Sequence, residues 1–431
     1  MKQDCLRPRR MEDRRVDCFS LLVLTLVSLL LPASCHASRP TSAAAAASSP
    51  PSPRLAAANT PPPPPPQIVS NRSDGLCASL ITSQGDYNCT EYMVQTNDGF
   101  LLGVQRMSSN SVDPTKGAIF LMHGLMVGGD VWVINEPSES LGFILADAGY
   151  DVWIGNSRTT MFSFGHASFQ RNDHEFWDWS VDEMAEQDLP AMLKLVFETV
   201  GNKMHYIGYS QGSQQAFAAF SQGQLLSMVN KVVMLAPIAY VDHGSALVEI
   251  GLFDLHVDQI LQVANVHEFS TRTHAGTQIV ELICRHSDRC FQSWIFLFAG
   301  NNCCLNMTKR SLLDKYETQS TSVKNLMHLA QQGRSSTFAK FDYGLFGNLR
   351  RYGSASPPRY ALENVPSNNL LLINGVEDAL ADPIDVAKLV TNLGGVVNTH
   401  THPSFGHLDF ILADSANTQI YPQILGFLDP L

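Results

Sequence analysis

The chain has little positive charge. Its 431 residues include 29 Lys and Arg against 40 Asp and Glu, which gives a net charge of −11. Nucleic acids are bound mainly through Lys and Arg on their phosphates, so this balance disfavours a nucleic-acid partner. Hydrophobic residues make up 45% of the chain and charged residues 16%. A sizeable core is therefore possible, and wholesale disorder is excluded.

No apolar run is long enough to cross a bilayer. The apolar-dominated segment over residues 19–31 is short, because a spanning helix needs about 20 residues. It follows a basic segment and precedes Pro32 and small residues up to Ala37, which is the pattern of a secretory signal peptide. We predict a signal peptide over residues 1–37 and no transmembrane anchor; an uncleaved anchor is the alternative.

Large apolar side chains are sparse just after this segment. Residues 38–67 are mainly Ala, Ser and Pro and include six consecutive prolines, Pro61 to Pro66. Such a composition cannot bury a core. We predict a disordered linker that tends toward polyproline II, and no repeat appears elsewhere in the chain.

No Cys-x-x-Cys pair occurs among the nine cysteines of the chain. The missing pair disfavours a zinc site, and we expect neither a metal nor a cofactor. Six cysteines follow the predicted signal peptide, and an even number in an exported chain is typical of disulfides. Cys77 and Cys89 flank a short loop, so we expect them to bond each other.

The other four of these cysteines lie within one short stretch of sequence. Neighbouring cysteines rarely bond each other. We therefore expect Cys303 and Cys304 each to bond Cys284 or Cys290, in an order that the sequence leaves open.

Three Asn-x-Ser/Thr sequons are permissive for glycosylation in an exported chain. They begin at Asn71, Asn88 and Asn306. Together with the signal peptide and the cysteines they predict a glycoprotein of the secretory pathway, either secreted or delivered to a vacuole or lysosome.

Short apolar strands alternate with helical patterns along the rest of the chain, after a β-hairpin turning at residues 97–99. This alternation predicts an α/β fold with a mostly parallel central sheet. More than a hundred residues separate the fourth of these strands from the fifth, which predicts an inserted helical subdomain. We divide the folded part into a core over 68–239 and 367–431 and an insertion over 240–366. The expected strands are 118–122, 150–154, 205–208, 232–235, 370–373 and 396–400.

A Gly-x-Ser-x-Gly motif, residues 208–212, directly follows the strand at 205–207 and precedes an Ala-rich helical segment. This is the context of a nucleophile elbow, in which a tight strand-to-helix turn exposes the serine hydroxyl. Flanking glycines are needed because such a turn brings backbones close together. We predict that Ser210 is a nucleophile.

A serine nucleophile needs a histidine base, and on this type of fold the base follows the last strand. His407 lies in a loop at the start of a helical segment, as a base requires. His400 and His402 fall in the alternating pattern of the strand itself, where a structural role is expected.

The orienting acid is expected just past a strand, between the serine and the histidine. Asp378 has this position. Asp382 precedes Pro383 and is expected to cap a helix, whose dipole Asp385 would complement. Asp409 is the remaining competitor, but chain order and loop geometry disfavour it.

Two backbone N–H groups are needed to bind the oxyanion of the tetrahedral intermediate. One is expected from Gln211, directly after the nucleophile, and the other from Leu125 in the loop after the strand at 118–122. His123 in this loop is expected to be structural.

From Cys77 to the C-terminus the chain resembles the acid lipase family of α/β-hydrolases, which includes gastric and lysosomal lipases, and within it most of all the plant triacylglycerol lipases. The resemblance implies the α/β-hydrolase fold, a triad of Ser210, Asp378 and His407, oxyanion donors at Leu125 and Gln211, and a cap with a lid in the insertion. Tyr209, Thr159 and Asn374 depart from the family, which usually has His, Gly and Gly there. The matching segments are 89–91, 95–100, 123–125, Asp-Val-Trp-Ile-Gly-Asn-Ser-Arg at 151–158, 175–180, 237–240, 341–344, 357–358, Asp378 with 380–383, and 407–410.

These features predict a serine hydrolase that cleaves lipid esters of the triacylglycerol type at a lipid–water interface through an acyl-enzyme. A carboxylesterase or thioesterase acting on small soluble esters is one alternative. A non-catalytic lipid-binding protein is the other. A movable part of the insertion would hide the apolar substrate channel from water.

Overall fold

The computed structural model of the chain describes residues 62–69, 72–110, 112–246, 256–270, 299–316 and 318–429. The predicted signal peptide, most of the predicted linker, Asn71, Cys284 and Cys290 lie outside these residues. No helix within them is long and apolar enough to cross a membrane.

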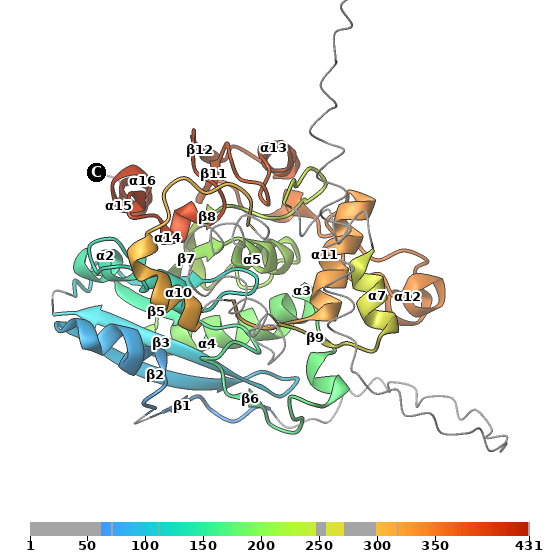
Figure 1. Cartoon of the computed structure of the whole chain (residues 1–431), viewed down its shortest axis with the longest axis horizontal. Helices are drawn as coiled ribbons and strands as arrows, with labels where there is room; N and C mark the ends of the chain where they lie inside the picture. The colour runs from blue at the N-terminus through green and yellow to red at the C-terminus, as the bar shows by residue number, and fades with distance from the viewer. Residues whose placement is uncertain are drawn as a thin grey trace, which may run out of the picture.

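One ten-stranded mixed sheet runs through the molecule (Figure 1). Its strands are β1 (Gln67–Ile68), β2 (Tyr87–Gln95), β3 (Phe100–Ser109), β4 (Ala118–Met122), β5 (Asp151–Gly155), β6 (Gly165–His166), β7 (Met204–Tyr209), β8 (Val229–Leu235), β11 (Leu370–Gly375) and β12 (Asn398–His402). The order is β1-β2-β3-β5-β4-β7-β8-β11-β12, with β6 paired to β3. The pairs from β5 to β12 are parallel, and the pairs on the β1 side are antiparallel. The predicted α/β fold is confirmed.

Helices cover both faces of the sheet. The helices outside the insertion are α2 (Leu141–Asp147), α3 (Val181–Glu183), α4 (Leu189–Val200), α5 (Gln211–Ser221), α13 (Pro383–Asn392), α14 (Asp409–Leu412), α15 (Ala416–Gln419) and α16 (Tyr421–Leu428). The described helices of the insertion are α7 (Val257–Val263), α10 (Arg310–Tyr316), α11 (Val323–Ser335) and α12 (Gly344–Tyr352). Short 3-10 or π turns are Cys77–Ile81, Thr82–Gln84, Gly129–Trp132, His174–Trp177, Met184–Asp188, Met307–Lys309 and Leu362–Asn364.

The central strand β4 shows how the two faces form separate cores. Ile119 and Leu121 belong to the core packed under α2 and α16. Phe120 and Met122 belong to the core packed under α4 and α5. All five residues of β4 are buried because a parallel strand covered on both faces has no solvent side, which explains its continuous apolar run.

Most predicted strands agree with the structure, and two boundaries are corrected. The hairpin is confirmed as β2 and β3, which pair antiparallel. Gln67, assigned to the linker, lies instead in β1 and pairs with Met93 of β2. The last strand begins at Asn398 rather than Val396, since Val396 is 85% exposed and the polar residues 398–402 pair with β11. An edge strand needs few apolar residues, so the apolar pair Val396 and Val397 does not mark the start of the strand.

Between β8 and β11 the described residues form helices and a small two-stranded sheet, β9 (Glu268–Phe269) with β10 (Thr321–Ser322). In Figure 1, α7, α11 and α12 gather on one side of the molecule, away from α15 and α16. An ion pair between Arg334 and Asp258, at 2.9 Å, joins α11 to α7. The boundaries 240–366 of the insertion remain a prediction.

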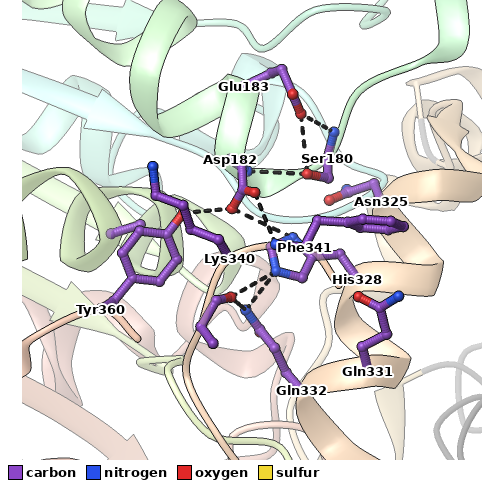
Figure 2. A network of polar contacts seen from close by, with 12 residues as sticks. Ser180, Asp182, Glu183, Asn325, His328, Gln331, Gln332, Lys340, Phe341 and Tyr360 are labelled. Carbon is purple, nitrogen blue, oxygen red and sulfur yellow. Dashed lines mark hydrogen bonds and ion pairs between the residues drawn. The ribbon is translucent and has the colours of Figure 1, made fainter. Parts of the chain in front are cut away.

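Buried polar groups attach α11 to the core at α3 (Figure 2). The carboxylate of Asp182 accepts hydrogen bonds from the Tyr360 hydroxyl and, at 2.9 Å, from the Phe341 N–H. His328 on α11 lies beside this carboxylate, with 3.8 Å between its Nδ1 and Oδ1, and its Nε2 is 2.8 Å from the Ala339 carbonyl. The Asp182 carboxylate and His328 Nε2 are buried and hydrogen-bonded, so they hold α11 on the core, whereas His328 Nδ1 has no hydrogen-bond partner among the described residues.

The cysteines confirm one predicted disulfide and correct another. Cys77 and Cys89 are bonded, as expected. Cys303 is bonded to Cys304, so the expectation that each reaches Cys284 or Cys290 is wrong. The backbone N–H groups of both residues donate to one carboxylate, that of Asp409. This shared acceptor orients the backbones of both residues toward one point, an arrangement that the spacing of the cysteines in the sequence could not reveal.

Candidate active site

Ser210 occupies the turn between β7 and α5. Its φ of 52° and ψ of −120° lie outside the regions that L-residues prefer. The turn leaves the side chain at the N-terminus of α5, and Ser210 N–H donates to the Leu235 carbonyl at 3.0 Å. The predicted strand-to-helix elbow is therefore present.

Glycine is required around this turn because neighbouring atoms are close. A Cβ at Gly212 would lie 2.3 Å from the Met122 carbonyl oxygen, and one at Gly208 would lie 2.8 Å from the Tyr206 ring. A Cβ at Gly124 would lie 2.8 Å from Ser210 Cβ. The loop that contains Leu125 is thus pressed directly against the serine.

Three predicted site residues, from distant parts of the chain, form one hydrogen-bonded series. His407 Nε2 lies 2.8 Å from Ser210 Oγ. His407 Nδ1 lies 3.0 Å from both carboxylate oxygens of Asp378. All three residues are buried. With Nδ1–H donating to the carboxylate, Nε2 is left to accept the serine proton.

Asp378 is fixed by its own backbone partners. Its Oδ1 accepts from Leu380 N–H at 3.0 Å and from Ala381 N–H at 2.8 Å. Asp382 caps α13 by accepting from Ile384 N–H at 2.7 Å, as expected. The two aspartates therefore have separate partners, and only Asp378 contacts the histidine among them.

Asp385 and Asp409 also have partners of their own. Asp385 is more than a complement to the helix dipole, since its carboxylate lies 2.7 Å from His243 Nδ1 and accepts from His243 N–H. Asp409 accepts from Gly406 N–H at 2.8 Å and from the N–H groups of the bonded cysteines. Its carboxylate serves the loop backbone rather than the imidazole.

His123 fixes the loop on the opposite side of Ser210. Its Nδ1 is 2.8 Å from the Gly124 carbonyl, to which it donates, and its Nε2 accepts from Ser157 N–H at 3.0 Å. Complete burial lowers the pKa of His123 to about 4. The ring is neutral and structural, and it orients the turn that leads to Leu125.

Side chains that the sequence did not single out support the residue after the nucleophile. Gln211 and Asn325 on α11 exchange hydrogen bonds through their side-chain amides, at 3.3 and 3.1 Å. One turn further along α5, Gln214 donates to Gln332 on α11 at 2.8 Å. These pairs join residues more than a hundred positions apart, so no local sequence pattern could reveal them.

Two sets of described side chains bring three possible metal-ligand atoms together: Cys303, Cys304 and Asp409, and Asp242, His243 and Asp385. In the first set the sulfurs are joined and the carboxylate already has three N–H donors. In the second set, Asp385 contacts His243, and Asp242 forms an ion pair with Lys388 at 2.6 Å. Each of these three side chains therefore already has a protein partner.

Known proteins match this chain over most of its length. Residues 78–136 match the family model described as the partial alpha/beta-hydrolase lipase region. Triacylglycerol lipase 1 of Arabidopsis thaliana is 39% identical over 82% of this chain and 90% of its own. The chain belongs to the acid lipase family of α/β-hydrolases. Gastric triacylglycerol lipase of Rattus norvegicus is 34% identical over 81% of this chain and 91% of its own. Lysosomal acid lipase/cholesteryl ester hydrolase of Macaca fascicularis is 32% identical over 83% of this chain and 92% of its own.

Two residues that depart from the acid lipase pattern make specific hydrogen bonds in the structure. Tyr209, at a position where the family usually has His, donates from its hydroxyl to the His407 carbonyl at 3.1 Å. Thr159, where the family usually has Gly, has a φ of 70°, the left-handed region that glycine favours. Its hydroxyl donates to the Ser320 carbonyl at 3.0 Å, which ties the loop to the insertion.

Proposed function

We propose that this acid lipase family member hydrolyses carboxylic esters of lipids, with substrates of the triacylglycerol type, through an acyl-enzyme. The observation that carries the proposal is the unbroken series Ser210–His407–Asp378 at a strained strand-to-helix turn. The relatives named as triacylglycerol and acid lipases support the lipid ester as substrate.

In this proposal His407 takes the proton of the Ser210 hydroxyl as that oxygen attacks the ester carbonyl. Asp378 holds the imidazole in the Nδ1–H tautomer and stabilises the imidazolium that forms. His407 then gives the proton to the departing alcohol. Water, activated by the same histidine, releases the fatty acid from the acyl-enzyme.

We assign the oxyanion hole to the backbone N–H groups of Gln211 and Leu125. Gln211 begins α5, where the N–H groups of the first turn have no partner within the helix. Leu125 follows Gly124, where an added Cβ would lie 2.8 Å from Ser210 Cβ. Preorganised N–H groups in a buried site stabilise a developing oxyanion because they need no reorientation during the reaction.

The insertion over 240–366 is proposed to act as a cap, part of it movable, that shields an apolar acyl site. Ser210 is only 7% exposed, and Leu125 packs against Leu326 and Ala330 of α11. The predicted signal peptide and the confirmed Cys77–Cys89 disulfide support a place in the secretory pathway, outside the cell or in a vacuole or lysosome.

The decisive experiment is hydrolysis across an acyl-chain series, below and above the solubility of each ester and at several pH values. We expect cleavage of long-chain glycerides, with a rise in rate when substrate forms an interface, and no activity in Ser210→Ala. Activity confined to short, dissolved esters would replace the lipase proposal with a carboxylesterase. Absence of turnover in the wild type would overturn the enzymatic proposal.

A further inference from the structure

Asp409 lies two residues beyond His407, and its carboxylate organises the loop that carries this histidine. The residue is 0% exposed. Oδ2 accepts from Gly406 N–H at 2.8 Å and from Cys303 N–H at 2.9 Å, and Oδ1 accepts from Cys304 N–H at 3.0 Å. A buried carboxylate is costly unless hydrogen bonds replace its hydration. Asp409 therefore depends on donors from both its own loop and the insertion.

The segment from Asn301 to Asn306 follows the histidine loop for several residues. Asn302 Oδ1 accepts from Leu408 N–H at 2.8 Å. Gly406 is so close that a Cβ there would lie 1.7 Å from the Asn301 carbonyl oxygen. Leu305 then pairs antiparallel with Ala413. A displacement of this segment would therefore be transmitted to the backbone on both sides of His407.

The disulfide between Cys303 and Cys304 lies within this segment. It restricts the backbone of the two residues whose N–H groups must point at one carboxylate. Donors that are already fixed lose less conformational entropy when they bind their acceptor. Removing the bond would leave the donors with more freedom and the Asp409 charge less well satisfied.

We propose that Asp409 is a positioning residue for His407 and that the Cys303–Cys304 disulfide holds the donors on which Asp409 depends. We name the set of Asp409, Cys303 and Cys304 the histidine clamp. The proposal rests on the proposed function. Its consequence is that reducing this disulfide lowers turnover by loosening the loop around His407, while the substrate-binding surfaces are kept.

The clamp is accessible to a reductant. Cys303 is exposed, whereas in the other described disulfide Cys77 is 8% exposed and Cys89 is half-buried. Thiol–disulfide exchange requires access to a sulfur. A dithiol such as dithiothreitol would supply two electrons and two protons, which convert the disulfide into two thiols, and would itself become a cyclic disulfide.

The test measures kcat and KM for a soluble short-chain ester, which avoids interfacial effects, in the oxidised and the dithiothreitol-treated full chain. Misplacing a catalytic group by a fraction of an ångström to an ångström lowers rates by roughly tenfold to a hundredfold. We expect such a loss in kcat with KM changed less than twofold, and recovery after the reductant is removed and oxidised glutathione is added. Mass spectrometry of alkylated peptides would identify the reduced pair.

Two variants separate the clamp from other disulfides. The double variant Cys303→Ser/Cys304→Ser should begin at the reduced level of kcat and show no further response to dithiothreitol. Asp409→Asn should lower kcat at least as much, because the amide has one acceptor oxygen instead of two. Circular dichroism would confirm folding.

An unchanged kcat in the double variant would overturn the proposal, as would a response to dithiothreitol that persists in it. If the double variant fails to fold, the test is reduction of the wild type with dithiothreitol and reoxidation, with peptide mapping of the reduced cysteines. A kcat that is unaffected when Cys303–Cys304 is fully reduced would overturn the proposal. A wild type without any esterase activity would instead contradict the proposed function, so the two failures are distinguishable.

Discussion

Next to Gln211 the insertion contacts α5 through neutral amides, whereas next to His407 it contacts the core through a charged group. The amide pairs Gln211–Asn325 and Gln214–Gln332 support the helix that supplies one proposed oxyanion donor. We call this set the oxyanion-side joint. The histidine clamp supports the proposed base through a buried carboxylate and a disulfide.

The difference shows that one insertion can stabilise two halves of a site with different sensitivities. Amide hydrogen bonds contribute about 1 kcal/mol each and depend on neither pH nor redox state. A hydrogen-bonded buried charge contributes more, and removing its donors is correspondingly more damaging. Reduction of the Cys303–Cys304 disulfide should therefore loosen the histidine side and leave the amide pairs in place.

The largest expected effect is on the histidine side, at the carboxylate that contacts the ring. Asp378→Asn should keep the fold and lower kcat by about 10⁴-fold, since an amide favours the wrong histidine tautomer. Asp382→Asn is the matched control and should change kcat little, because Asn caps a helix nearly as well as Asp. Steady-state kinetics with circular dichroism would check both. An active Asp378→Asn together with an inactive Asp382→Asn would move the acid to Asp382.

A second prediction concerns how the free energy of unfolding depends on pH through His123, which lies on the oxyanion side. Burial lowers the pKa of His123 to about 4 in the folded state, against about 6.5 in the unfolded chain. Between these values the unfolded chain binds more protons, so the free energy of unfolding falls as pH decreases from 6.5 toward 4. The full loss from this group is roughly 3 kcal/mol.

Urea unfolding at pH 7 and pH 4.5 would measure this effect in the wild type and in His123→Asn. The variant should lose less stability between the two pH values, because it lacks the group that must stay neutral. Equal losses in both proteins would show that His123 does not contribute. Buried His205, whose pKa burial also lowers to about 4, is unchanged in the variant and should account for part of the remaining loss.

A third prediction breaks the oxyanion-side joint directly. Asn325→Ala should lower kcat on the order of tenfold, because the Gln211 side chain loses Asn325 and keeps only the 3.5 Å contact with Gln214, while the backbone donors remain. This loss is less than the 10²- to 10³-fold typical of removing a donor. Gln211→Ala should have a similar effect, and the double variant should be little worse than either single one.

Gln331→Ala is the control on the same helix, since Gln331 bonds the backbone of Asp342 away from the site. Its kcat should match the wild type. Fully additive losses in Asn325→Ala and Gln211→Ala would show that the two residues act independently.

The smallest effect is expected at Thr159. Thr159→Gly should change the free energy of unfolding by less than about 1 kcal/mol, because relief of the positive φ offsets the lost hydrogen bond to Ser320. Thr159→Ala keeps the unfavourable φ and loses the bond, so it should be destabilised by about 1 kcal/mol. Equal stabilities of the two variants would contradict this account.

The sequence predicted what depends on local pattern. The limits of β4 agree at every residue because a buried parallel strand has a continuous apolar run. Ser210, His407 and Asp378 were found because each follows a strand or turn of recognisable chemistry. The Cys303–Cys304 bond was not expected because neighbouring cysteines rarely bond each other. The Gln211–Asn325 pair could not be predicted because it depends on where distant segments meet. Asp409 illustrates the same limit: its role is set by N–H groups a hundred residues away.

The backbone of Ser210 has an evolutionary consequence. A φ of 52° costs a side-chain-bearing residue on the order of 1 to 2 kcal/mol, and glycine would pay almost none of it. A library screened for heat resistance alone should therefore enrich glycine at this position. A screen that rewards turnover should instead retain the serine.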